Sequence, residues 1–186
     1  MANLIVISGA QASGKMTIAN KIKEKTDYTV ATNHDSLEVP AKIFGWGTEG
    51  FKKLRDLIRS SIFDIAIENN VNLIFTFVFA FDMQEDWDYV NSLKEKFEKN
   101  NGKFYFVELE TSLEERLKRN VCEDRLKEKP TKRDIERSNK ELIDTVDKYR
   151  LNSNDGEVTY ENYLKINNTD KTPEEVADII IKKFKL

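Results

Sequence analysis

A glycine-rich segment near the start of the chain has the residue types and spacing of a phosphate-binding loop. It follows the apolar run at residues 4–7 and matches the pattern G-x-x-x-x-G-K-[ST] at Gly9, Gly14 and Lys15. Glycines let consecutive backbone N–H groups turn toward one phosphate, and the following helix directs its positive end there. The lysine ammonium can follow the β- and γ-phosphates of a nucleotide. We therefore expect a nucleoside triphosphate to be bound by Gly9, Ala10, Ala12, Ser13, Gly14, Lys15, Met16 and Thr17.

Met16 occupies the motif position that usually carries a hydroxyl. In GTPases and motor-type ATPases that hydroxyl ligates Mg²⁺ directly, whereas a thioether is a poor ligand for a hard cation. Thr17, one residue later, can still hydrogen-bond a phosphate oxygen from the first helical turn. Met16 therefore argues against direct ligation of Mg²⁺ at this position, and no metal site built from side chains is expected.

The composition is typical of one compact domain. The chain has 186 residues, 39% of them hydrophobic, and only 7 Gly and 3 Pro, which is too few for a flexible linker. The net charge of −3 argues against general nucleic-acid binding, and the apolar stretch at residues 73–81 is too short to cross a bilayer. Cys122 is the only cysteine and no signal-peptide pattern precedes Leu4. We expect a single domain over residues 1–186, located in the cytoplasm and without a membrane partner.

Apolar runs and helical periodicities alternate along the chain. Strands are expected at residues 4–8, 28–32, 73–79, 104–109 and 163–166. Helices are expected at residues 15–25, 51–69, 87–97 and 135–149, and after the capping-box patterns that begin at Ser112 and Thr172. This alternation predicts an α/β fold with a parallel sheet covered by helices on both faces. Ligands bind such sheets at the carboxyl ends of the strands.

Polar side chains follow each of the next three expected strands. Asn33-His34-Asp35 comes after the second strand, Asp82 comes after the third, and an arginine-bearing helix comes after the fourth. Arg55 and Arg59 lie four residues apart on one helix face, where an anionic acceptor could bridge them, although pairing with neighbouring acids is the alternative. Because the strand ends share one edge, we expect these groups to converge there.

These motifs resemble the small P-loop kinases, a group that includes the nucleoside monophosphate kinases, shikimate kinase and chloramphenicol phosphotransferase. The resemblance is carried by Lys15-Met16-Thr17, Glu115-Arg116, the basic segment 119–133 and Asn167-Asn168-Thr169-Asp170. Residues 73–78, 105–110, 114–120 and 149–153 are similar to uncharacterised bacterial ATP-binding proteins labelled shikimate-kinase-like. The resemblance implies a three-layer P-loop NTPase fold with strand order 2-3-1-4-5 and transfer of a phosphoryl group from Mg-ATP. It also implies a lid at residues 119–133 and an acceptor-binding segment at residues 33–69.

The same resemblance assigns roles to single residues. On the nucleotide side, Arg116 would lie against the adenine ring, Arg119 would contact the nucleotide, and Arg125 would close over the β- and γ-phosphates. Asp35 would orient or deprotonate the acceptor hydroxyl. The acceptor itself would be a small molecule or nucleotide bound by His34, Arg59 and Asp82, and the choice of functional acid among Asp35, Glu38 and Asp82 stays open.

Departures from the family patterns leave alternatives open. Thr76 stands where nucleoside monophosphate kinases place an aspartate for the waters of Mg²⁺, and Phe79-Ala80-Phe81 replaces a glycine triplet that shikimate kinase uses, which argues against shikimate as the acceptor. The alternative function is an ATP-binding regulatory or interaction protein, or an NTPase, without phosphoryl transfer to an acceptor. A polynucleotide or tRNA kinase would need a basic groove that this acidic chain does not supply.

The segment Thr131-Lys132-Arg133-Asp134 matches the [NT]-K-x-D pattern with which GTPases bind guanine. Here the charged residues 126–130 precede it, whereas GTPases have a hydrophobic strand at that place. We interpret it as a helix start, with Thr131 as the cap and Asp134 three positions into the helix.

Overall fold

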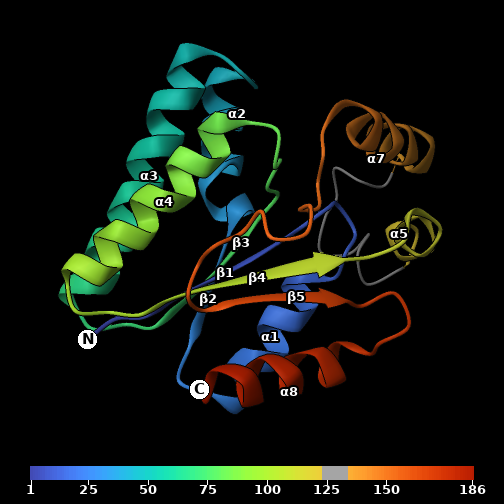
Figure 1. Cartoon of the computed structure of the whole chain (residues 1–186). Helices are drawn as coiled ribbons and strands as arrows, with labels where there is room; N and C mark the ends of the chain where they lie inside the picture. The colour runs from blue at the N-terminus through green and yellow to red at the C-terminus, as the bar shows by residue number, and fades with distance from the viewer. Residues whose placement is uncertain (123–133) are drawn as a thin grey trace.

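The computed structural model describes residues 1–122 and 134–186, whose strands form one parallel sheet. The order is β2-β3-β1-β4-β5, which confirms the predicted sheet and strand order (Figure 1). The strands are β1 (Leu4–Gly9), β2 (Thr29–Thr32), β3 (Leu73–Phe77), β4 (Phe104–Glu110) and β5 (Tyr163–Asn167). The third strand ends two residues earlier than the apolar run predicted, because residues 78–80 leave the ladder and turn away from it.

The helices match the predicted amphipathic segments, with two short additions. The helical elements are α1 (Lys15–Lys25), the 3₁₀ turn η1 (Asn33–Ser36), α2 (Glu38–Phe44), α3 (Glu49–Glu68), α4 (Gln84–Lys99), α5 (Leu113–Asn120), α7 (Ile135–Lys148) and α8 (Pro173–Phe184). The sequence did not predict η1 and α2. In α2 the side chains of Val39, Ile43 and Phe44 are all exposed and only Pro40 is buried, so this short helix contributes little apolar surface to the core.

Two apolar layers hold the sheet between its helices. Helices α3 and α4 cover one face, and α1 and α8 cover the other (Figure 1). In the first layer Phe63 of α3 packs edge-on against Phe75 of β3 and Phe97 of α4, with centroids 5.3 and 6.1 Å apart. In the second layer Ile18 of α1 and Val176 of α8 belong to the same buried cluster. Because β1 is buried along its whole length, its sequence is continuously apolar rather than alternating.

The helix caps follow the sequence patterns with one difference. Thr172 and Glu175 form the predicted reciprocal capping box at the start of α8. Ser112 caps α5 by accepting a hydrogen bond from the Glu115 N–H at 3.2 Å. The Glu115 carboxylate, however, accepts from Arg119 Nε at 2.8 Å instead of returning to the cap. The second half of this predicted capping box is therefore replaced by an ion pair.

Helix α7 begins later than the sequence interpretation placed it. Asp134 is itself the cap, and its side chain accepts a hydrogen bond from the Arg137 N–H at 3.1 Å. Its predicted position three residues inside a helix is therefore wrong, while Thr131 lies outside the described residues. None of the described helices is long and apolar enough to span a membrane.

Candidate active site

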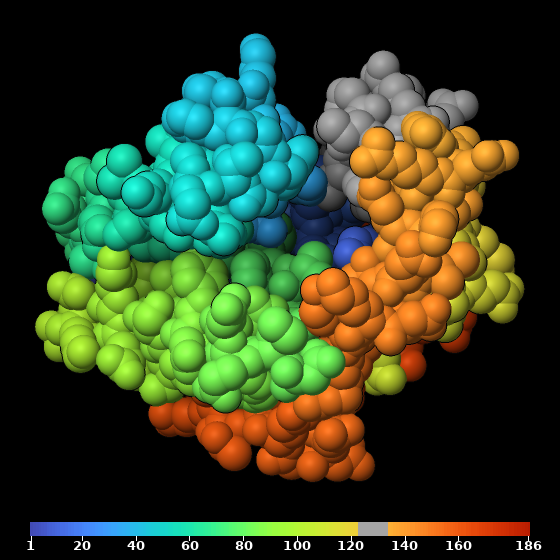
Figure 2. Space-filling model, turned by 90° about the horizontal axis from the view of Figure 1, so that it is seen from above, coloured from blue at the N-terminus to red at the C-terminus, as the bar shows by residue number. Residues whose placement is uncertain are grey.

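The predicted site residues gather at the carboxyl edge of the sheet. Seen from above that edge, the surface is hollowed between the α2–α3 segment, drawn in cyan, and α7, drawn in orange (Figure 2). Blue atoms of the first residues of the chain lie at the floor of this hollow. The β1–α1 loop thus separates a side formed by η1 and α3 from a side formed by α5 and α7.

The backbone of the phosphate-binding loop requires glycine. Gly9 has φ +152°, and a Cβ placed on it would lie 2.8 Å from Ser13 Oγ and 3.0 Å from the Leu109 carbonyl oxygen. Gly14, directly before α1, has φ +90° in the left-handed region. The first turn of α1 contains no acidic residue, so the positive end of its dipole is not offset. The loop has the strained, closely packed backbone that a phosphate cradle needs.

Lys15 is folded over this loop. Its Nζ donates hydrogen bonds to the carbonyl oxygens of Gly9 and Ala10, both at 2.7 Å. A bound phosphate would be a stronger acceptor for the ammonium than these neutral carbonyls. Met16 is half-buried, whereas Thr17 is exposed on the first turn of α1, where its hydroxyl can reach a ligand.

Arg119 and Asn168 tie the loop to the end of β5. Asn168, 1% exposed, donates from Nδ2 to the Ser13 carbonyl oxygen at 2.8 Å and accepts from Thr111 Oγ1 at 2.6 Å. Arg119 Nη2 donates to the carbonyl oxygens of Asn168 and Thr169, both at 3.0 Å. Sequence reasoning did not give Asn168 a role of its own, although it lies in the segment that carried the family resemblance. These bonds fix the wall of the loop beneath α5.

Arg116, on the same helix, is a buried cation that no carboxylate of the described residues neutralises. It is 4% exposed, and among those residues neither its Nε nor its Nη1 has a hydrogen-bond partner. Burial lowers the pKa of its guanidinium, as expected when a charge is removed from water without compensation. An uncompensated buried charge is costly and so indicates a ligand. Its predicted contact with adenine stays a prediction, and Arg125 and most of the predicted lid lie outside the described residues.

Arg59 is the corresponding cation on the other side of the loop. It is 8% exposed and donates to Ser36 Oγ at 3.0 Å and to Asn33 Oδ1. Its guanidinium lies over the rings of Tyr89 and Phe77, 5.4 and 5.9 Å from the centroids. No carboxylate of the described residues forms an ion pair with it, and burial lowers its pKa. Arg59 is therefore a buried charge without a carboxylate partner among the described residues, next to the turn η1.

The neighbouring Arg55 behaves differently. Its Nε donates to Asp56 Oδ1 at 2.7 Å, so the alternative of pairing with a nearby acid holds for this arginine. Asp64 is engaged as well, because it pairs with Lys96 of α4 at 2.6 Å. Only one arginine of the predicted pair is therefore left for an anionic ligand.

The predicted acids take structural roles that leave them only partly available. Asp35 is exposed, and its Oδ2 accepts the Thr32 N–H at 2.6 Å in a capping box around η1. His34 is half-buried in the same turn, and Glu38 is exposed at the start of α2. The turn brings Asp35 to the segment that contacts Arg59, but its role as a base stays a prediction.

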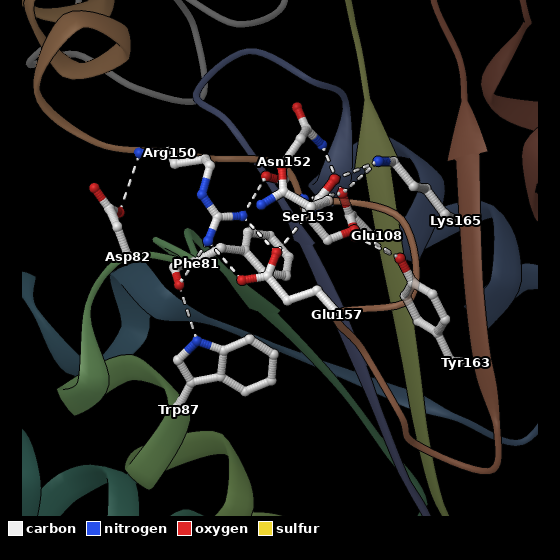
Figure 3. A network of polar contacts seen from close by, with 11 residues as sticks. Phe81, Asp82, Trp87, Glu108, Arg150, Asn152, Ser153, Glu157, Tyr163 and Lys165 are labelled. Atoms are coloured by element: carbon white, nitrogen blue, oxygen red, sulfur yellow. Dashed lines mark hydrogen bonds and ion pairs between the residues drawn. The ribbon is translucent and has the colours of Figure 1, made fainter.

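Asp82 anchors the chain that follows α7. Its Oδ1 accepts the Arg150 N–H at 3.0 Å, and the Phe81 N–H donates to the Arg150 carbonyl oxygen at 2.7 Å (Figure 3). Phe79 and Phe81 are buried in the aromatic core, with ring centroids 4.6 Å apart, and do not line the hollow. The segment in place of the shikimate kinase glycine triplet thus serves packing.

No protein-family model and no curated protein matches the chain. Solved structures match it over nearly its whole length. A sugar kinase from Janibacter sp. has a TM-score of 0.62 and 16% identity, covering 100% of this chain and 95% of that one. Shikimate kinase from Acinetobacter baumannii has a TM-score of 0.58 and 16% identity, covering 99% and 93%. The APS kinase of Mycobacterium tuberculosis, in complex with AMPPNP and APS, has a TM-score of 0.59 and 13% identity, covering 100% and 98%.

The chain has the fold of the small P-loop kinases. The fold accounts for the position of the glycine loop, Arg116 and Arg59 on one edge of the sheet, since the loop follows β1, Arg116 lies on the helix after β4, and Arg59 contacts the turn after β2. At these identities the likeness concerns the fold and leaves the acceptor open.

Within the P-loop kinase fold, Asp86 is a residue that sequence reasoning missed. It lies in the first turn of α4, and its Oδ2 accepts the Ala80 N–H at 2.8 Å. Ala80 packs in a small cluster with Ala10 of the phosphate loop and Leu151. Burial raises the pKa of Asp86, with the Ala80 N–H opposing this. An acid in the first turn of a helix is common, so the sequence carried no signal of its burial.

A buried carboxylate secures the segment at residues 149–158. Glu108 of β4 is fully buried and accepts from the Ser153 N–H at 2.9 Å, Ser153 Oγ at 2.6 Å, Asn152 Nδ2 at 2.9 Å and Tyr163 Oη at 2.6 Å (Figure 3). Burial alone would raise the pKa of Glu108, but these donors together outweigh it and hold the pKa below its usual range. The charge is further offset by Lys165 Nζ at 3.6 Å. This network fixes the wall of the hollow that continues from α7.

Proposed function

We propose that the protein is an ATP-dependent phosphotransferase that moves the γ-phosphate of Mg-ATP to a small-molecule or nucleotide acceptor. The observation that carries this proposal is the pair of buried arginines without carboxylate partners among the described residues, Arg116 and Arg59, on opposite sides of one glycine-requiring loop. A charge buried without a partner is maintained at a cost in stability. Two such charges beside a phosphate cradle support one anionic ligand on each side.

On the nucleotide side, the loop residues and Arg119 form the binding surface for the triphosphate. The chain fits this ligand because Gly9 is too closely packed against Ser13 and Leu109 to carry a Cβ, Gly14 has a left-handed conformation directly before α1, and no acid offsets the positive end of that helix. Lys15 would exchange its two carbonyl partners for phosphate oxygens. Arg116 would contact the adenine ring and Arg125 the β- and γ-phosphates. Mg²⁺, held by phosphate and water oxygens, would supply neutralisation of the phosphate charge.

On the acceptor side, Arg59 would bind an anionic group of the acceptor. Tyr89 supports this because its hydroxyl is buried without a hydrogen-bond partner among the described residues and its ring lies beneath the Arg59 guanidinium. Burial raises the pKa of Tyr89 to about 12, so it stays a hydrogen-bond donor at neutral pH. His34 and Asp82 would complete the acceptor contacts. Asp35 would accept the proton of the acceptor hydroxyl, with Glu38 and Asp82 as the remaining candidates for this acid.

A panel screen with site variants tests the proposal. Metabolites, nucleosides and nucleotides, each acid matched with its neutral amide or ester, are tested for phosphorylation that depends on ATP. We expect transfer only to acceptors with an anionic group, and loss of both ATP binding and transfer in Lys15→Ala. Binding and turnover unchanged by Lys15→Ala would contradict the phosphate-loop assignment.

Arg59→Lys and Tyr89→Phe separate acceptor binding from folding. Arg59→Lys keeps the charge but loses the planar fork, so the KM for the acceptor should rise at least about tenfold while the KM for ATP stays constant. Tyr89→Phe removes a hydroxyl that has no partner within the described part of the protein, so thermal stability should not fall while the acceptor KM rises. An unchanged acceptor KM in both variants would exclude this pocket as the acceptor site.

An ATP-binding protein that transfers no phosphate is the second candidate. It is favoured by the structural engagement of Asp35 and Asp82 and by Thr76 in place of an acid. In that case the panel should yield no phosphorylated product, while ATP still binds and Lys15→Ala still abolishes its binding.

A further inference from the structure

Helix α3 carries a row of exposed apolar side chains on the side away from Arg59. Leu57 is 63% exposed and Ile65 is 57% exposed, and both belong to a long helix that covers one face of the sheet. They border a groove of about 800 Å³ that is lined chiefly by Leu57, Ile58, Ser61, Ile62, Ile65 and Val71. We refer to it as the α3 groove. A contiguous apolar surface of this kind marks an interaction site more often than isolated exposed residues do.

The spacing along α3 is self-complementary. Leu57, Ser61 and Ile65 are four residues apart and therefore lie in one row along the helix. Suppose that two copies of α3 pack antiparallel about a two-fold axis at Ser61. Each residue before Ser61 then lies opposite the residue that is the same number of positions after Ser61 in the second copy. Leu57 then packs against Ile65 of the second copy, twice. The small Ser61 side chain at the centre lets the two helices approach closely.

Charges at the two ends of the row agree with the same arrangement. Lys53 lies four residues before Leu57, and Glu68 lies three residues after Ile65. Both are exposed, and among the ion pairs of the described chain neither has a partner. Antiparallel packing about Ser61 brings Lys53 of one copy to Glu68 of the other, at both ends of the contact. Parallel packing would place like charges together and is disfavoured.

The available area suits a weak, reversible dimer. One face of the 20-residue α3 is about 30 Å long and one helix diameter, about 10 Å, wide, which is roughly 300 Å² on each copy. Val71 and Leu73, which line the same groove, add to this surface. A pair that buries less than about 1,200 Å² in total belongs to the weak or transient interfaces.

We propose that the α3 groove is the interface of a symmetric homodimer, formed by antiparallel packing of α3 against α3 of a second copy about Ser61. The groove faces away from the hollow of the candidate active site, because Arg59 occupies the buried face of the same helix. The dimer contact would therefore support the helix that carries Arg59 without covering the site. This proposal does not depend on the proposed function.

Sedimentation velocity of the full chain tests the dimer over concentrations from about 10 µM to about 1 mM. The unaltered chain should shift from monomer to a species of twice the mass. Leu57→Glu, at a largely exposed position, should raise the dissociation constant at least about tenfold, whereas the control Ile179→Glu on α8, 38% exposed, should leave it unchanged. A chain that stays monomeric, or a dimer unaffected by Leu57→Glu, would overturn the proposal.

A charge exchange tests the antiparallel register. Lys53→Glu alone and Glu68→Lys alone each place like charges at both ends and should weaken the dimer. High salt screens this repulsion, so the single variants should regain part of their affinity there. The double variant restores opposite charges in exchanged order and should regain the original dissociation constant. If the double variant does not regain the original dissociation constant, although it and the two single variants have equal thermal stability, this register is excluded.

Discussion

Replacement of Glu108 by Gln tests how the wall at residues 149–158 is held. The substitution preserves shape but removes the charge that receives four hydrogen bonds. Glu108 Oε1 accepts two N–H groups, whereas Oε2 accepts the hydroxyls of Ser153 and Tyr163, which can rotate to accept from an amide. In the variant, the glutamine oxygen should therefore occupy the position of Oε1, and the glutamine NH₂ group should occupy the position of Oε2.

The size of the effect follows from these partners. Charge-assisted bonds are about twice as strong as neutral ones, so the four bonds lose roughly 1 kcal/mol each, about 4 kcal/mol together. Relief from burying a charge returns about 1 to 2 kcal/mol of this. The variant should lose about 2 to 3 kcal/mol of unfolding free energy at pH 7. The control Glu110→Gln, on the exposed end of β4, should stay within about 0.5 kcal/mol.

The loss should depend on pH in a defined direction. The native pKa of Glu108 lies below the unfolded value of 4.5, so the charged form stabilises the fold above that pH. This contribution disappears as the pH falls through the lowered native pKa, because the carboxyl of the unaltered chain is then neutral like the amide of the Glu108→Gln variant. Urea denaturation of both proteins at pH 7 and at successively lower pH measures the difference in unfolding free energy. A difference that is zero at pH 7, or that does not shrink on acidification, would refute the reasoning.

Three further substitutions test the loop and its supports. Gly9→Ala should abolish nucleotide binding, because its Cβ would lie 2.8 Å from Ser13 Oγ and 3.0 Å from a backbone carbonyl oxygen. The control Gly47→Ala has open space around its Cβ and should retain binding. Equal nucleotide binding by the two variants would contradict the steric argument. Asn168→Ala should cost about 1 to 3 kcal/mol and weaken ATP binding, since it removes the shorter of the two hydrogen bonds to the Ser13 carbonyl oxygen and the acceptor of the buried Thr111 hydroxyl. Thermal unfolding and nucleotide titration measure this, and an unaffected affinity would disprove the coupling. Thr172→Ala should destabilise α8 by about 1 kcal/mol without changing ATP affinity, because the Thr172 side chain hydrogen-bonds only to Glu175 in the first turn of α8. The same two measurements check this, and a weakened ATP affinity would show that the cap influences the site.

The sheet and most helices could be predicted because their signals are local. A continuously apolar run such as β1 and the regular spacing of α3 each specify one element and its buried face. The glycine loop was also predictable, since its backbone conformation is written in residue types at fixed spacing. In contrast, η1 and α2 bury little apolar surface, so no periodic pattern marks them.

The hydrogen-bond partners of the acidic residues could not be predicted, because these partners are distant in sequence. Asp82 is engaged by Arg150 and Glu108 by Ser153, pairs separated by 68 and 45 residues. The difference between Arg55 and Arg59 has the same origin, since one reaches a neighbouring acid and the other is enclosed by η1 and α4. Spacing on a helix face indicates which side chains are neighbours but not which of them the tertiary structure buries.

The central place of β1 in the sheet has a consequence for the order in which the protein is built. Leu4 is aligned with Leu73 of β3 on one side and with Phe104 of β4 on the other, so β1 is synthesised before both of the strands that it pairs with. The glycine loop after β1 packs against Leu109 and Asn168, so its contacts are complete only after β5 has been synthesised. Nascent chains truncated before β5 should therefore be unable to bind nucleotide, and folding should be slow compared with a helical protein of this length because its essential contacts are distant in sequence.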